Sequence, residues 1–241
     1  MKRMDLLVQG TEELGISLSN AQLDSFNTYY RELVDWNSRF NLTSITSHND
    51  VQIKHFLDSL TLLLTVNPSA LKISKVIDVG TGAGFPGIPL RIVFPELKLY
   101  LVDSVAKKTG FLEHVLERLN IPDVTVLTGR AESFAHDVNM RETFDFVLAR
   151  ALARLPVLLE YTLPFCTIGG QVIAWKHGGI DQEIDDAAAA CQLLGGTLAP
   201  VCNINIDNLS DNRILVLVEK TRSTPSGYPR KAGFARKNPI I

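Results

Sequence analysis

The chain has 241 residues, of which 46% are hydrophobic and 21% are charged, with a formal net charge of −2 at pH 7. This length suffices for one large core, or for a core with a small appended module. No apolar run reaches the length of a membrane span, and the amino terminus lacks the pattern of an export signal. We therefore expect a cytoplasmic protein. Cys166, Cys191 and Cys202 are too widely spaced to predict a disulfide framework or a metal site.

The first predicted elements form an N-terminal helical module, residues 1–70. Residues 19–22 make a capping box, and apolar side chains then recur at helical spacing in one amphipathic helix that ends near Asn41. Its aromatic residues are expected in the core. A second helix is predicted from about residue 50 to 65, and the pair 67–68, Asn-Pro, ends it.

Residues 76–89 carry the most information, because they predict a buried strand that runs through a glycine turn into a helix. Alternate glycines allow a sharp turn and a close approach of a ligand to the backbone. Pro86 is compatible with a helix that starts there, since the first turn of a helix has amide groups without partners. The segment therefore predicts the cradle of a nucleotide-type cofactor.

Two cofactors fit the glycine turn. Gly82, Gly84 and Gly87 make the dinucleotide pattern of an NAD site, whereas Asp78 and the glycines at 80, 82 and 84 make an acid-x-Gly-x-Gly-x-Gly pattern. The carboxylate of Asp78 would repel a pyrophosphate, but it suits the ammonium group of S-adenosylmethionine. We expect S-adenosylmethionine, with NAD as the alternative.

Two later carboxylates fit the same cofactor. Asp103 follows a predicted strand, 97–102, about 20 residues beyond the glycine turn, where it can accept both ribose hydroxyls. The alternative is a helix N-cap for residues 106–119. Glu132 follows the strand 124–127 and is expected near the adenine, with a surface carboxylate in the first turn of a helix as its alternative.

The remaining elements complete an α/β fold. We predict strands over 144–149, 170–175, 199–206 and 213–219, helices over 152–164 and 181–194, and a polar turn over 207–212. Alternating strands and helices imply a doubly wound, mostly parallel sheet, and the short turn before the last strand makes that strand antiparallel. The sequence thus predicts a seven-stranded Rossmann-like domain over residues 71–220.

The C-terminal tail, residues 221–241, has five cations and no acid. Its cations alternate with aromatic residues, a composition that suits phosphate contact and base stacking. We predict that the tail binds RNA and that deletion after Glu219 spares cofactor binding. The predicted RNA-binding residues are Arg222, Arg230, Lys231, Arg236 and Lys237. The alternatives are a solvated extension, or a part of the fold that closes over the cofactor.

A parallel sheet with an antiparallel end is typical of class I S-adenosylmethionine-dependent methyltransferases, and several sequence blocks resemble one family of them. The blocks are Asn41-Leu42-Thr43, residues 54–60, 78–90, 102–104, 130–132 and 150–151, and a closing Tyr-Pro-Arg-Lys-x-Gly motif. In order and spacing they resemble the bacterial ribosomal RNA small-subunit methyltransferase G family, also known as glucose-inhibited division protein B. The resemblance covers nearly the whole chain.

This resemblance implies methyl transfer to N7 of a guanine in the decoding-region loop of 16S ribosomal RNA, with the RNA or the small ribosomal subunit as partner. It also implies which residues contact the cofactor: Gly80, Phe85, Ala131, Glu132 and Arg150. Lys108 stands where other members often carry arginine, which is a mild departure.

Methylation at guanine N7 needs no general base, because N7 has a lone pair and no hydrogen, so positioning is the main task. The chain lacks the Asp-Pro-Pro-Tyr or Asn-Pro-Pro-Tyr motif that exocyclic-amine methyltransferases carry after the fourth strand, and Arg150 stands there instead. Arg150 could clamp the methionine carboxylate or donate to guanine O6, with a surface ion pair as the alternative. Cys166 follows a helix rather than a strand end, which disfavours a thiol nucleophile.

His55 and Asp58 share a helix face at a spacing of i, i+3. They are predicted to position the site or to form a structural hydrogen bond, and neither is expected to be catalytic. Three interpretations remain: the ribosomal RNA guanine-N7 methyltransferase, an S-adenosylmethionine-dependent methyltransferase of another substrate, and an NAD-linked oxidoreductase or non-catalytic nucleotide-binding module.

Overall fold

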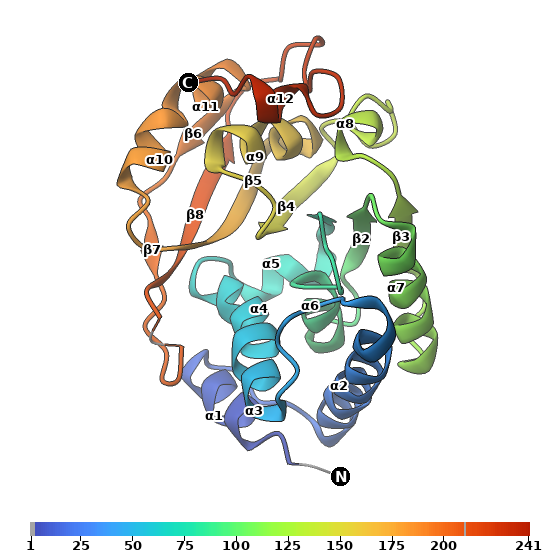
Figure 1. The fold of residues 1–241 in the computed structure, drawn as a ribbon. Coiled ribbons are helices and arrows are strands. Elements are labelled where there is room, and N and C mark those ends of the chain that lie inside the picture. The colour runs from blue at the N-terminus through green and yellow to red at the C-terminus, as the bar shows by residue number, and fades with distance from the viewer. Residues whose placement is uncertain (1–2, 210) are drawn as a thin grey trace.

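A computed structural model of the chain describes residues 3–209 and 211–241. One sheet crosses it in the order β3-β2-β1-β4-β5-β8-β6, and β7 also pairs with β8 (Figure 1). Strands β1 to β5 pair in parallel, whereas β8 is antiparallel to β5, β6 and β7. The strands are β1 Lys75–Val79, β2 Lys98–Asp103, β3 Thr125–Thr128, β4 Phe144–Arg150, β5 Cys166–His177, β6 Gly196–Leu198, β7 Cys202–Asn203 and β8 Arg213–Lys220.

The predicted α/β sheet with an antiparallel end is confirmed, but the strand predicted over 199–206 is wrong. In its place β6 and β7 pair separately with β8. Pro200 lies between them, and proline has no N–H to donate to a strand ladder. The sheet within the described residues therefore has eight strands rather than seven.

Helices cover both faces of the sheet (Figure 1). The face of the sheet toward the N-terminus of the chain is covered by α1 Asp5–Glu13, α2 Asn20–Phe40, α3 His48–Val51, α4 Asp58–Leu60, α5 Pro68–Ile73, α6 Gly87–Val93 and α7 Ala106–Arg118. On the other side lie α8 Ala131–Phe134, α9 Leu155–Thr162, α10 Asp181–Asp186, α11 Ala188–Leu193 and α12 Phe234–Lys237. None of the described helices is long and apolar enough to cross a membrane.

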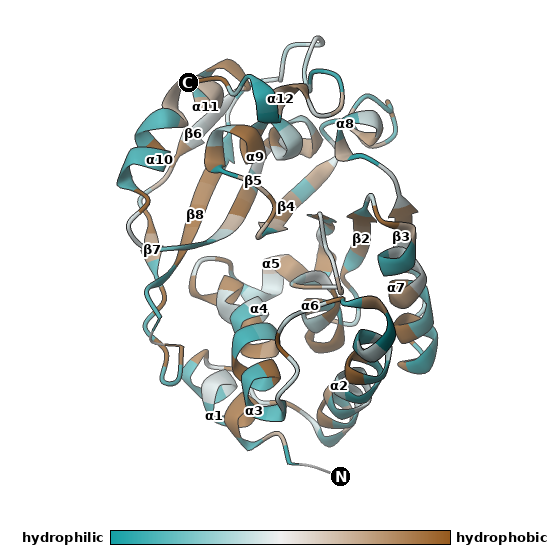
Figure 2. Ribbon diagram, viewed as in Figure 1, coloured by the Kyte–Doolittle hydropathy of each residue, from teal (hydrophilic) through white to brown (hydrophobic). Residues whose placement is uncertain are grey.

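Side chains alternate along the strands between two hydrophobic clusters. On β2, Leu99 and Leu101 belong to the cluster under the N-terminal helices, whereas Tyr100 and Val102 belong to the cluster under α9. Figure 2 shows β5 and β8 mainly hydrophobic and the outlying α10 mainly hydrophilic. The sheet is thus buried on both faces, as expected of a doubly wound fold.

The N-terminal helices share their core with the sheet. Phe26 and Tyr29 of α2 are fully buried in the same cluster as Val76 of β1. The capping box at residues 19–22 is confirmed, since both of its reciprocal hydrogen bonds are present. The boundary at residue 70 stays a prediction.

The helix predicted over 50–65 is a continuous helical path whose winding changes. After α3 it becomes a π-helix, Gln52–Leu57, then α4, then a 3-10 helix, Thr61–Leu64. Short π-helical segments occur frequently at functional sites, because the wider turn redirects side chains. Asn67 then caps α5, so the Asn-Pro pair starts the next helix.

The second half of the chain needs two further corrections. The helix predicted over 181–194 is divided at Ala187 into α10 and α11, and the one predicted over 152–164 begins later and ends in a 3-10 helix, Leu163–Phe165. The tail is not a solvated extension, because α12 folds back and packs against α9 (Figure 1).

Candidate functional site

Asp78 braces the glycine turn after β1. Its side chain is fully buried, and Oδ2 accepts hydrogen bonds from the Thr81 hydroxyl at 2.7 Å and the Gly87 N–H at 2.9 Å. Burial raises the pKa of Asp78 to about 6. Asp78 therefore ties the turn to the start of α6, and it lines neither of the two cavities at this end of the sheet. Its contact with a cofactor ammonium group stays a prediction.

The glycine turn is packed on one side and open on the other. At Gly84, φ is +97°, and a Cβ would lie 2.5 Å from the hydroxyl oxygen of Tyr29. At Gly82, φ is +62°, and a Cβ would meet no atom within 4 Å. The bare backbone of Gly82 therefore faces free space that a ligand can occupy.

A first cavity, of about 230 Å³, lies at the ends of β2 and β3, and Asp103 is in its wall. The oxygens of Asp103 accept one backbone hydrogen bond each, from Gly82 at 3.0 Å and from Val105 at 2.9 Å. Since a carboxylate oxygen can accept two hydrogen bonds, both retain a lone pair for a ribose hydroxyl. The N-cap of α7 is Val105, so the capping alternative for Asp103 is wrong.

Glu132 lies in the wall of the same cavity and is buried, which contradicts the alternative of a surface carboxylate. It accepts the N–H of Gly233, in the tail, at 3.1 Å. Arg236 of the tail also lines this cavity, and its Nη2 lies 3.4 Å from the carbonyl oxygen of Leu152. The tail thus contributes Arg236 to the wall of this cavity and holds Glu132, and the effect of deletion after Glu219 on cofactor binding stays a prediction.

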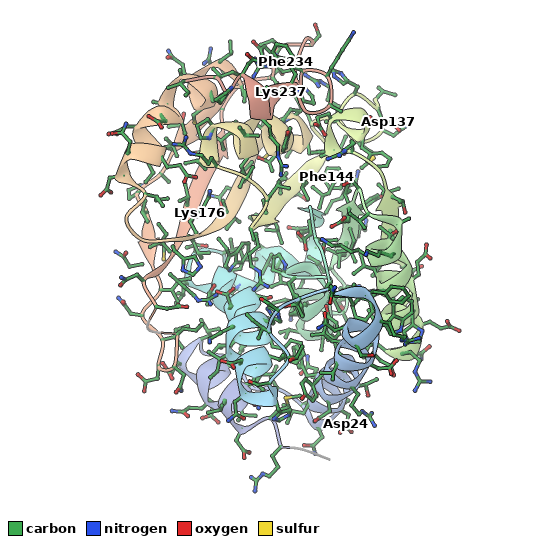
Figure 3. All side chains as sticks on the ribbon, viewed as in Figure 1. Asp24, Asp137, Phe144, Lys176, Phe234 and Lys237 are labelled. Carbon is green, nitrogen blue, oxygen red and sulfur yellow. The ribbon has the colours of Figure 1, made fainter. Side chains whose placement is uncertain are left out.

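A second cavity, of about 510 Å³, lies between the glycine turn, the ends of β4 and β5, and the loop after α2. Gly80, Lys108 and Ala151 line both cavities, so the two adjoin. The second cavity is rich in cations: Lys54, Lys108, Arg150, Lys176 and Arg213. Figure 3 labels Lys176 near the end of β5. A cavity of this charge attracts anions such as a carboxylate or a phosphate.

Arg150 connects the end of β4 to the π-helix. Its Nη1 donates to Asp58 Oδ2 at 2.6 Å and to the Lys54 carbonyl at 3.0 Å, and its Nη2 lies 2.9 Å from His55 Nδ1. Asp58 is 1% exposed, and Nη1 of Arg213 lies 2.7 Å from its other oxygen. The alternative of a surface ion pair for Arg150 is therefore wrong, because the pair is buried and belongs to a network.

His55 is a neutral, fixed ring in this network. It stacks on Phe85 with ring centroids 4.4 Å apart, and its Nε2 lies 2.9 Å from the Thr43 hydroxyl oxygen. Burial and the charge of Arg150 lower the pKa of His55 to about 3. The ring therefore carries no charge at physiological pH, which suits a positioning role.

The tail cations predicted to bind RNA differ in their surroundings. Arg230 forms an ion pair at 2.6 Å with buried Glu160, and Arg236 lines the first cavity. Arg222 is exposed and donates to the Gln192 carbonyl at 2.8 Å. Lys231 and Lys237 are exposed, and Figure 3 labels Lys237 at α12.

Sequence reasoning missed three residues that hold this site: Trp175, Lys176 and Arg213. The indole N–H of Trp175 donates to the Asp58 carbonyl at 2.8 Å, which anchors α4 to β5. Trp175 and Lys176 lie at the carboxyl end of a parallel strand, where open α/β sheets bind ligands, and that signal could have found them. Arg213 begins an antiparallel strand, and no sequence pattern marks it.

The cysteines lie away from this chemistry. Cys166 is buried at the start of β5, the end opposite the site, and burial raises its pKa to about 12. Cys191 is buried, whereas Cys202 is partly exposed. Within residues 3–209 and 211–241, no group of His, Cys, Asp or Glu side chains could hold a metal ion.

Solved structures share this architecture. The O-methyltransferase from Bacillus cereus in complex with SAH matches with a TM-score of 0.57 and 17% identity, over 80% of this chain and 91% of that one. A mutant of MtNAS in complex with S-adenosylmethionine matches with a TM-score of 0.54 and 16% identity, over 91% of this chain and 78% of that one. The chain therefore has the fold of class I S-adenosylmethionine-dependent methyltransferases.

The family follows from the sequence comparisons. The family model GidB, rRNA small subunit methyltransferase G, matches residues 22–209. The ribosomal RNA small subunit methyltransferase G of Dehalococcoides mccartyi is 48% identical over 238 residues, which make up 99% of this chain and 100% of that protein. The protein of the same name from Leuconostoc citreum is 43% identical over 98% of this chain and 99% of that protein. The chain belongs to the rRNA small subunit methyltransferase G family.

Proposed function

We propose that this protein transfers a methyl group from S-adenosylmethionine to N7 of a guanine in the decoding-region loop of 16S ribosomal RNA. Family membership supports this assignment, and one observation on the site carries it. Two titratable side chains that line the second cavity are poor proton acceptors, because the pKa of His55 is lowered to about 3 and both oxygens of Asp58 face arginines. Such a site suits a nucleophile that has no proton to lose.

Bound S-adenosylmethionine supplies an electrophilic methyl group. The first cavity suits its adenosine part, with Asp103 at the ribose and Ala131 and Glu132 at the adenine. The second cavity adjoins it and suits both the methionine end and the target base. The residues proposed for the methionine end are Asp78, Gly80, Gly82, Gly84, Phe85 and Arg150.

The proposed partner is 16S ribosomal RNA, either free or in the small subunit, and this substrate places the protein in the cytoplasm. A methyltransferase of another substrate is the alternative within the same fold. The positive second cavity favours RNA, because nucleic acid brings a phosphate at every nucleotide.

The product can be identified chemically. Small subunits from a strain that lacks this protein are incubated with the enzyme and labelled S-adenosylmethionine. We expect one labelled 7-methylguanosine, whose fixed charge makes the ring reducible and the RNA cleavable there by aniline. A label in 5-methylcytosine, in N6-methyladenosine or in protein would contradict the assignment, although the fold would stand.

The exposed tail cations are proposed to contact RNA phosphates. Replacing Lys231 and Lys237 with alanine should reduce the slope of log K for RNA binding against log salt by about 0.7 for each lost contact with single-stranded phosphate. Lys98→Ala is the matched control, because Lys98 is exposed at the opposite end of β2. An unchanged slope in the double variant would show that these lysines do not touch RNA.

A further inference from the structure

Thr43 ends a chain of hydrogen bonds that begins at Arg150. A guanidinium group only donates, so the 2.9 Å contact between Arg150 Nη2 and His55 Nδ1 has Nδ1 as the acceptor. Nδ1 also lies 3.1 Å from the Lys54 carbonyl oxygen, but that oxygen already accepts from Arg150 Nη1 at 3.0 Å, and a protonated Nδ1 would point its N–H at a guanidinium N–H. The neutral ring carries a single proton, and the network therefore assigns that proton to Nε2. The Nε2–H faces the Thr43 hydroxyl oxygen at 2.9 Å and donates to it.

Both lone pairs of the Thr43 hydroxyl are therefore occupied. Besides His55, the backbone N–H of Ile45 donates to the same oxygen at 3.1 Å. A hydroxyl oxygen accepts two hydrogen bonds, so its own hydrogen must serve another acceptor. No acceptor for it lies among the described residues, and Thr43 lines the second cavity. The fold thus presents one neutral, oriented donor to that cavity.

We propose that the Thr43 hydroxyl donates to O6 of the target guanine and thereby determines the choice of base. The proposal rests on the function given above. Guanine presents O6 and N7 as neighbouring acceptors, and an arginine would bind both together and mask the nucleophile. A single hydroxyl takes O6 and leaves the N7 lone pair free. Adenine has an amino group at that position, so two donors would oppose each other.

The charges around Thr43 favour the base over the methionine carboxylate as its acceptor. A carboxylate forms its strongest hydrogen bonds with charged donors. Most cations of the second cavity already pair closely with protein carboxylates, and Lys108 is the most loosely paired of the five. Lys108 also borders the first cavity, where its Nζ lies 3.8 Å from Asp103. Thr43 instead belongs to the loop after α2, which lines the second cavity but not the first.

The test measures kcat/KM for 7-methylguanosine formation on small subunits, together with the Kd for S-adenosylmethionine. Thr43→Val should lower kcat/KM roughly ten- to hundredfold, as expected for one lost hydrogen bond to the base, with Kd unchanged. Thr43→Ser keeps the hydroxyl and should stay within about threefold of the wild type. Thr46→Val is the matched control, because Thr46 is exposed on the same loop and does not line the cavity.

A substrate change tests the same bond with the unaltered protein. Subunits reconstituted with 2-aminopurine at the target position keep N7 but lack O6. On this substrate the kcat/KM of the wild-type protein should fall by roughly the same factor as the Thr43→Val substitution causes on guanine. The substitution should lower kcat/KM on 2-aminopurine little further, since the hydrogen bond to O6 is already absent. A wild type that methylates both bases equally would overturn the proposal, as would a valine variant whose only change is weaker cofactor binding. Failure of the proposed function would differ, because the wild type itself would form no 7-methylguanosine.

Discussion

Replacement of Asp103 with alanine should weaken the binding of S-adenosylmethionine by roughly two to four decades. Each oxygen of this carboxylate already accepts one backbone N–H and has room for one ribose hydroxyl. Two hydrogen bonds to a charged acceptor, each worth about 1.5 to 3 kcal/mol, account for a loss of that size. Isothermal titration calorimetry measures it directly.

Two further variants distinguish the loss of ribose binding from a distortion of the glycine turn, which Asp103 also holds through Gly82. Asp103→Asn keeps one oxygen acceptor and should fall between the wild type and alanine. Asp24→Ala removes an exposed carboxylate near the start of α2 (Figure 3), which does not line the first cavity, and should bind as the wild type does. An alanine variant at position 103 with unchanged affinity would remove this residue from the cofactor site.

Patterns that are local in sequence predicted the cofactor side of the site. The glycine turn, the carboxylate after β2 and the helix that follows each depend on residues within a few positions of one another. Chain order then determines which strand ends meet, since parallel strands bring their carboxyl ends to one edge. For this reason the sequence predicts Asp103 at the ribose and Glu132 near the adenine of one cofactor, and both residues line the first cavity.

Contacts between distant segments were not predictable in the same way. Arg150 and Asp58 are 92 positions apart, and their contact depends on how the helical segment that carries Asp58 packs against the end of β4. Their shared helix face correctly grouped His55 with Asp58, but no periodicity shows which side of a helix meets a strand end. The packing of the tail was not predictable for a similar reason, because composition indicates the charge of Arg230 without showing its partner, Glu160.

Replacement of Arg230 with alanine should destabilise the protein by about 3 kcal/mol. Its guanidinium makes three hydrogen bonds, at 2.6 to 3.1 Å, with the carboxylate of Glu160, which is 1% exposed. Removing one partner leaves a buried charge without compensation, at a typical cost of about 3 to 5 kcal/mol. The backbone N–H of residue 230 still donates to Glu160, which favours the lower end of that range.

Urea denaturation compares this variant with Lys231→Ala, whose exposed side chain is adjacent in sequence and should change stability by less than about 0.5 kcal/mol. The pair Arg230→Met with Glu160→Leu removes both charges and should recover most of the loss, because apolar residues of similar volume often replace a buried ion pair without cost. Arg230→Ala should also weaken S-adenosylmethionine binding, since it loosens the segment that carries Gly233 and Arg236 to the first cavity. Equal stability of the Arg230 and Lys231 variants would mean that the ion pair does not hold the tail in place.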